Sequence, residues 1–169
     1  MMHLRPATKK DVDLLRHWDK QPHVAAAVSN DDWQWETDLE INYGWREQLI
    51  AEENERPVGF LQIIDPAREI SQYWGSIDSG YRAIDIWIGE QSDLGKGYGT
   101  EMMNLALKRI FSDETVMAVL LDPLASNTKA HRFYNRLNFK FVGERMFDLD
   151  LCFIFKLTRS DWLNANDQD

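Results

Sequence analysis

The sequence is poor in cysteine and lacks any long hydrophobic run. Cys152 is the single cysteine, so no disulfide can form within the chain, which favours a reducing, cytoplasmic setting. No apolar stretch approaches the roughly 18 residues that a membrane span needs, and the first residues lack the apolar segment of a secretory leader. We therefore expect a cytoplasmic protein without a membrane partner.

Positive charge is also scarce. Lys and Arg number 19 against 28 Asp and Glu, which gives a net charge of −9. A negative field of this size repels phosphodiesters, so we expect no nucleic-acid partner. The first 80 residues hold 15 acidic and 8 basic side chains, so most of the excess lies in the first half. This excess provides solubility or forms a surface for a cationic ligand, and the sequence leaves both interpretations open.

No repeat, low-complexity segment or flexible linker interrupts the sequence, and we expect a single domain over 1–169. Alternating apolar residues and turn residues predict strands over 2–5, 48–53, 58–64, 84–88, 116–121, 139–143 and 151–157. Helical spacing predicts helices over about 8–18, 101–111 and 127–137, and a mixture of helix and loop over 29–45. The long polar loop 65–81 is more typical of a functional segment than of a short connection. This order predicts a mixed α/β fold with three layers around one sheet.

The strongest local signal is a glycine-rich turn between the strand 84–88 and the following helix. It consists of Leu94, Gly95, Lys96, Gly97, Tyr98, Gly99 and Thr100. Glycine lets the backbone turn tightly and approach a ligand, and the N–H groups at a helix start suit a pyrophosphate. The spacing is neither that of a P-loop nor that of a Rossmann motif. Taken alone, the turn either binds a pyrophosphate or binds nothing.

In its wider context this turn resembles the acyl-CoA pyrophosphate loop of the GNAT N-acetyltransferase superfamily. Further segments are similar to those of the aminoglycoside 6′-N-acetyltransferases, namely Tyr81–Asp85, Gly89–Glu90, Leu121–Pro123, Ser126–Asn127 and Ala130–Tyr134. The resemblance is strong over roughly 80–140 and weaker before it. It implies the GNAT fold, an α/β (α+β) architecture whose mixed, mostly antiparallel central sheet is flanked by helices. It also implies acetyl-CoA as the cofactor.

Two positions depart from the family pattern. Leu94 stands where many members have Arg or Gln, and Asn138 stands where glycine is common. Neither change removes a backbone donor, so we expect cofactor binding to survive both. By resemblance, the cofactor is bound by Ile86, Trp87, Ile88, the loop residues Leu94, Gly95, Lys96, Gly97, Tyr98, Gly99 and Thr100, and by Asn127 and Tyr134.

Acetyl transfer to an amine needs a proton acceptor for the incoming ammonium, an oxyanion donor and an acid for the departing thiolate. Asp85, in the strand that leads to the loop, is our candidate base, unless a partner such as Arg82 satisfies it. Asp122 ends the next strand and either orients the amine or stabilises a turn. By resemblance, Tyr134 protonates the thiolate; otherwise it is a packed core aromatic. Asn127 either contacts the pantetheine arm or simply caps a helix. We expect the oxyanion donor among the backbone N–H groups of Ile86–Ile88.

The expected substrate is a small polycation, with the 6′-amine of an aminoglycoside as the leading case, acetylated by a resistance-type enzyme. Its acidic contacts are expected to be Asp65, Glu69, Asp78, Asp85 and Asp122. Competing interpretations are acetylation of a polyamine, a siderophore precursor, a protein terminus or a lysine, a non-catalytic acyl-CoA-binding module, and a domain without a ligand. The four histidines lie in different elements, so we expect no metal site. The protein is expected to be a monomer or a homodimer.

Overall fold

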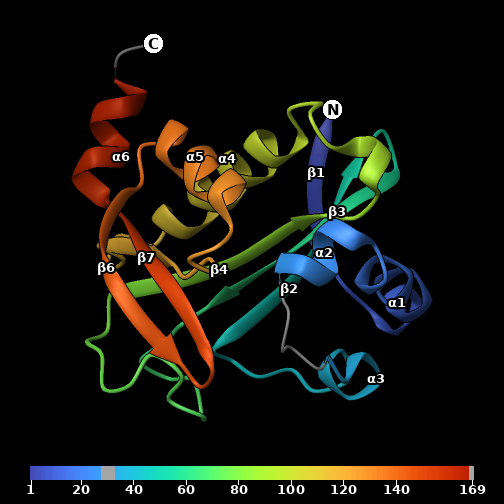
Figure 1. Ribbon diagram of the computed structural model, residues 1–169, viewed down its shortest axis with the longest axis horizontal. Helices are drawn as coiled ribbons and strands as arrows, with labels where there is room; N and C mark the ends of the chain where they lie inside the picture. The colour runs from blue at the N-terminus through green and yellow to red at the C-terminus, as the bar shows by residue number, and fades with distance from the viewer. Residues whose placement is uncertain (28–32, 168–169) are drawn as a thin grey trace. The chain divides into compact units, whose positions relative to one another are not determined.

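The computed structural model describes residues 1–27 and 33–167, so part of the stretch 29–45 lies outside the described residues. The described residues divide into two compact units, whose helices and strands are labelled in Figure 1. Unit 1 comprises Met1–Ile63 and Asp85–Lys108, and unit 2 comprises Ile64–Ile84 and Arg109–Asp169. Among the described residues, no helix is long and apolar enough to cross a membrane.

The described part of unit 1 combines β-strands with helices. Its elements are β1 (Met2–Pro6), η1 (Lys9–Asp11), α1 (Val12–Asp19), α2 (Pro22–Ala27), α3 (Trp35–Asp38), β2 (Arg46–Glu53), most of β3 (Arg56–Ile64), the second half of β4 (Tyr81–Ile88), η2 (Gln91–Asp93) and most of α4 (Tyr98–Phe111). β1 and β2 pair antiparallel. The predicted hairpin between β2 and β3 is confirmed, and its turn is shorter than predicted because Arg56 and Pro57 belong to β3. Asn54 and Glu55 form the turn, with positive φ angles of 50° and 67°.

An aromatic cluster covers one face of β2–β4 in unit 1, beneath α1–α3. It consists of Leu15, Trp18, Val24, Trp35, Ile50, Phe60 and Trp87. Side chains alternate between the two faces of a strand, so a Cβ at Gly59 would lie on the face of β3 opposite to Phe60. A Cβ at Gly59 would meet the side chain of Met102 in α4, so α4 covers the other face. Unit 1 therefore has the three layers that the sequence predicts.

Unit 2 contains the rest of the sheet. Its elements are the first half of β4, β5 (Ala118–Leu121), α5 (Thr128–Arg136), β6 (Lys140–Phe147), β7 (Asp150–Thr158) and α6 (Arg159–Asn166). The strand order is β1-β2-β3-β4-β5-β7-β6. β5 runs parallel to β4, whereas β7 is antiparallel to both β5 and β6. The predicted mixed sheet is confirmed, while α2 and α6 are elements that the sequence analysis did not identify.

The long loop between β3 and β4 packs onto one face of unit 2. Trp74 of this loop is buried with Ala83, Leu120, Phe147 and Ile154 in a second hydrophobic cluster. The loop is therefore a packed part of unit 2 rather than a loose connection.

Candidate active site

The glycine-rich turn forms an exposed cradle at the start of α4. Gly95 and Gly97 have φ angles of 74° and 83°, in the left-handed region that favours glycine. A Cβ built at either position would meet nothing within 4 Å, so the space beside the turn is open. The first N–H groups of an α-helix have no carbonyl partner within the helix. An open turn that ends in such donors fits a pyrophosphate group.

The buried carboxylate of Asp93 links this cradle to β3. Asp93, only 2% exposed, accepts hydrogen bonds of 2.8 and 3.1 Å from Arg56 of β3 and one of 3.2 Å from Lys96 in the turn. The hydrogen bonds from Arg56 are the main reason that the pKa of Asp93 lies below its ordinary value. The sequence analysis did not identify Arg56 or Asp93, because their pairing depends on the tertiary structure.

The candidate base, Asp85, lies on β4 in unit 1 beside a buried amide. The Nε2 of Gln62 in β3 donates a 2.6 Å hydrogen bond to Asp85 Oδ2. Removal from water raises the pKa of Asp85, and the Gln62 hydrogen bond lowers it by less. The alternative partner, Arg82, instead forms ion pairs of 3.6 and 3.7 Å with Asp65 and Asp113. Asp85 is therefore a carboxylate whose charge the surrounding protein compensates poorly.

Gln62, which hydrogen-bonds Asp85, and Trp87, on the same face of β4, carry buried polar atoms without partners among the described residues. The Oε1 of Gln62 is buried and has no hydrogen-bond partner among the described residues. The indole nitrogens of Trp33 and Trp87 are also buried and also lack a partner there. Trp87 follows Asp85 by two residues and packs 4.7 Å from Phe60. Buried polar groups are nearly always hydrogen-bonded, so the Oε1 of Gln62 is an acceptor available to a polar group beside Asp85. Sequence reasoning missed Gln62, which lies on a neighbouring strand without a motif of its own.

Asp122 lies in unit 2, directly after β5, and its carboxylate is engaged by the long loop. The hydroxyl of Tyr73 donates a 2.6 Å hydrogen bond to Asp122 Oδ2. The predicted loop contacts have partners within unit 2 as well. Asp65 pairs with Arg82, and Glu69 accepts hydrogen bonds from Ser71 and from the backbone of Tyr73. Their roles towards a substrate stay predictions.

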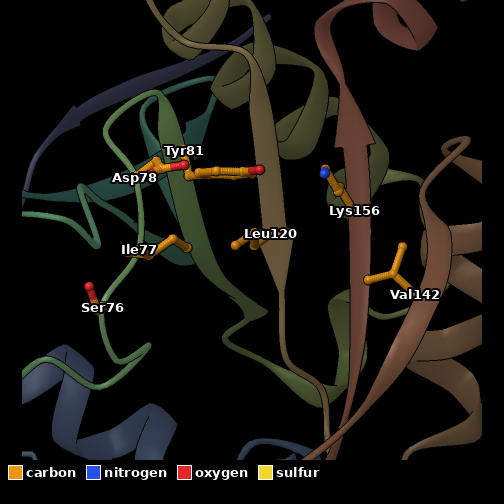
Figure 2. Close-up of a pocket in the computed structure, with 7 residues that line it drawn as sticks. All are labelled: Ser76, Ile77, Asp78, Tyr81, Leu120, Val142 and Lys156. Atoms are coloured by element: carbon orange, nitrogen blue, oxygen red, sulfur yellow. The ribbon is translucent and has the colours of Figure 1, made fainter.

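The third predicted loop acid, Asp78, lines a separate cavity in unit 2 of about 380 Å³ (Figure 2). The lining residues are Ser76, Ile77, Asp78, Tyr81, Leu120, Val142 and Lys156. The Lys156 ammonium lies 5.2 Å from the centre of the Tyr81 ring, and Figure 2 shows it facing that ring across the cavity. A resident cation opposes the entry of a second one, so this cavity suits a polycation less well than the surroundings of Asp85.

Tyr134 and Asn127 have structural roles in α5. Tyr134 is 8% exposed, with its ring centre 6.0 Å from those of both Phe139 and Phe155. The side-chain oxygen of Asn127 caps α5 by accepting a hydrogen bond of 3.2 Å from the backbone of Ala130. These contacts are the structural alternatives considered above, and the roles of both residues towards a cofactor stay predictions. Asn138 follows Leu137, the C-cap of α5, and its φ of 70° lies in the left-handed region common just after a helix end.

A pyrophosphate-type cradle at a helix start, together with a mixed sheet that carries a partly buried carboxylate, is typical of enzymes that transfer an acyl group from a nucleotide-bearing carrier. Residues 7–147 match the family described as acetyltransferase (GNAT) domain. The chain belongs to this family, which confirms the predicted fold and the prediction of an acetyl-CoA-dependent N-acetyltransferase.

Relatives with more specific names share this family. An aminoglycoside N(6′)-acetyltransferase type 1 of Klebsiella pneumoniae is 26% identical over 150 residues, covering 83% of this chain and 74% of that protein. The lysine N-acyltransferase MbtK of Mycobacterium tuberculosis is 23% identical over 146 residues, covering 83% and 70%. The crystal structure of aminoglycoside acetyltransferase AAC(6′)-Ib in complex with coenzyme A and kanamycin has a TM-score of 0.85 at 24% identity, covering 98% of this chain and 99% of that one. At this identity, the structural likeness concerns the fold.

Proposed function

We propose that this chain transfers the acetyl group of acetyl-CoA to a primary amine of a small polycation, with the 6′-amine of an aminoglycoside as the leading acceptor. The observation that carries the proposal is Asp85, a carboxylate of raised pKa beside the unpartnered amide oxygen of Gln62. A carboxylate with a neighbouring acceptor oxygen is suited to an ammonium group. The name of the Klebsiella pneumoniae relative supports the choice of acceptor.

The cofactor role of the cradle rests on its open backbone. Gly95 and Gly97 leave room for a pyrophosphate, and the first N–H groups of α4 donate to it. Asp93 keeps the turn in place through Lys96. When bound, acetyl-CoA supplies an activated thioester. The backbone N–H groups of Ile86–Ile88 are proposed to stabilise the oxyanion.

Asp85 is proposed as the base. An aliphatic amine is mostly protonated at neutral pH, and attack on a carbonyl requires its neutral form. The carboxylate attracts the ammonium. Its raised pKa lies closer to the working pH, which makes it a better base than an ordinary aspartate. The Oε1 of Gln62 accepts a second hydrogen bond from the amine, while its Nε2 keeps the Asp85 carboxylate in place. Asp122 is proposed to orient the acceptor, and Tyr134 to supply a proton to the leaving thiolate.

The test is a thiol-release assay with acetyl-CoA and a matched set of amines. The key pair is an aminoglycoside with a 6′-amine and an analogue with a 6′-hydroxyl at the same position. We expect release with the first and none with the second. Spermidine, free lysine and a peptide with a free N-terminus serve as competing acceptors. Faster thiol release with any of them would make that amine, rather than the aminoglycoside, the proposed acceptor. Binding of acetyl-CoA without release from any amine would favour a non-catalytic acyl-CoA-binding module.

A further inference from the structure

The segment of the long loop around Tyr73 is held firmly on unit 2. The ring of Tyr73 stacks on Phe147 at the end of β6, with ring centres 4.3 Å apart and planes 6° from parallel. The Arg145 guanidinium lies 4.8 Å from the centre of the Phe147 ring. Arg145 also donates a 2.9 Å hydrogen bond to the carbonyl of Trp74, the residue after Tyr73. Stacking and hydrogen bonding together fix both the ring and the backbone at this point.

Glu69 fixes the backbone of the loop just before Tyr73. Glu69 Oε2 accepts a 2.9 Å hydrogen bond from the backbone N–H of Tyr73, and Glu69 Oε1 accepts from Ser71. Partial burial raises the pKa of Glu69, but these hydrogen bonds outweigh it, so the pKa is lowered and the group stays ionised at neutral pH. The position of the Tyr73 hydroxyl is therefore set by the fold rather than by a ligand.

The hydroxyl that this arrangement positions donates to the carboxylate of Asp122 at 2.6 Å. We propose that Tyr73 is a positioning residue for acceptor binding, because its hydroxyl holds the Asp122 carboxylate in the orientation that receives an amino group of the substrate. This inference rests on the proposed function, in which Asp122 orients the acceptor. Tyr73 itself is assigned no proton transfer.

The physical basis is the restraint that a hydrogen bond places on a carboxylate. Asp122 follows the last residue of β5, and the Tyr73 hydroxyl fixes one of its carboxylate oxygens. A short hydrogen bond from a phenol to an ionised carboxylate is among the stronger neutral-donor contacts. Fixing the carboxylate before the substrate arrives lowers the entropy lost on binding. The hydroxyl is expected to act on acceptor affinity rather than on the chemical step.

The experiment compares Tyr73→Phe with wild-type enzyme in steady-state assays and by calorimetric binding of kanamycin. Phenylalanine keeps the stack on Phe147 and removes only the donor. We expect KM and Kd for the aminoglycoside to rise about tenfold, as for the loss of a hydrogen bond to a charged group, while kcat and KM for acetyl-CoA stay within about twofold. Tyr43→Phe is the matched control. The ring of Tyr43 stacks on Trp45 in unit 1, and this variant is expected to behave as wild type.

Asp122→Asn and the double variant Tyr73→Phe/Asp122→Asn complete a double-mutant cycle. In the Asp122→Asn background, adding Tyr73→Phe should change KM by less than about twofold, because the hydroxyl acts through the carboxylate. Equal effects of Tyr73→Phe in both backgrounds, or an equal loss of kcat and of affinity for both substrates, would overturn the inference. If Asp122→Asn leaves acceptor KM unchanged, the inference fails while the acetyltransferase activity stands. If the wild-type protein releases no thiol with any amine, the proposed function is overturned. This assay is therefore carried out before the variants are compared.

Discussion

Asp85 must be deprotonated before it can accept a proton from the substrate ammonium. Because burial raises its pKa, the rate should rise with pH through a value above the ordinary range of an aspartate. Asp85→Asn keeps the shape of the side chain and removes its basicity. We expect kcat to fall about 10²- to 10⁴-fold, with the KM for acetyl-CoA near wild type. A pH profile of kcat in the variant should lack the acidic limb of the wild-type profile.

The stability of the Asp85→Asn variant provides the control. A carboxyl group whose pKa is raised in the folded state stabilises that state while it is protonated, and this contribution is lost as the pH rises through the folded pKa. Above the folded pKa of Asp85 the wild-type protein has lost this contribution, so in that pH range the variant should have an equal or higher Tm. A folded variant with near-normal kcat would contradict the assignment of the base. The role would then pass to Asp122, to a water chain or to free amine from solution.

The sequence singles out residues as candidates where a local motif surrounds them. Asp85 alternates with isoleucines in a strand, and Gly95 and Gly97 stand in a dense glycine turn. The sequence does not single out Gln62 or Tyr73, because each is distinguished only by a hydrogen bond to a residue at least 23 positions away. Neither has a charge or a spacing that distinguishes it locally, so pattern reasoning has no signal to read.

Elements with a strong apolar pattern were predicted with nearly correct boundaries. The stripe that begins at Met102 gave α4, and the alternation over 84–88 gave β4. β4 begins earlier than predicted, because Tyr81–Ala83 pair with β5 despite their polar neighbours. α2 and α6 were missed. The six residues of α2 are too few for a periodic pattern, and only Val24 among them is buried. The described residues of α6 include no buried side chain, so its amphipathic signal is weak.

The cradle before α4 yields a prediction at the scale of an element. Gly97→Ala adds a methyl group where the structure leaves open space, so its cost to the free protein is backbone strain at a φ of 83°, about 1–2 kcal/mol. The same methyl group occupies the approach of a pyrophosphate. We expect the affinity for acetyl-CoA, measured by calorimetry, to fall at least about tenfold, and Gly97→Val to lower it further.

Gly143 in β6 offers a matched comparison. It has a φ of 157°, and a Cβ there would also meet nothing within 4 Å. Gly143→Ala should therefore lower the Tm by an amount similar to Gly97→Ala, yet leave the affinity for acetyl-CoA unchanged. Unchanged affinity in a folded Gly97→Val protein would show that the turn does not contact the cofactor.

The net charge of −9 acts over the whole molecule. Many acidic side chains are already engaged in ion pairs, such as Glu40 with Lys9 and Asp93 with Arg56. Asp78 is exposed and lines the cavity that contains Lys156. The sequence left open whether the acidic excess serves solubility or attracts a cation. The two explanations differ in their dependence on salt, because surface fields are screened beyond about 8 Å at physiological ionic strength.

If the acidic residues attract a polycation, the KM for an aminoglycoside should rise steeply as salt increases, whereas the KM for a monoamine should change little. The double variant Glu69→Gln/Asp78→Asn should raise the aminoglycoside KM more than it lowers kcat, and should flatten the salt dependence. Glu114→Gln/Asp148→Asn removes two exposed charges elsewhere in unit 2 and is the matched control. Equal effects of the two pairs would mean that total charge, rather than the loop, attracts the substrate. An aminoglycoside KM that is independent of salt would assign the acidity to solubility alone, because an attraction between a polycation and an acidic surface must weaken when it is screened.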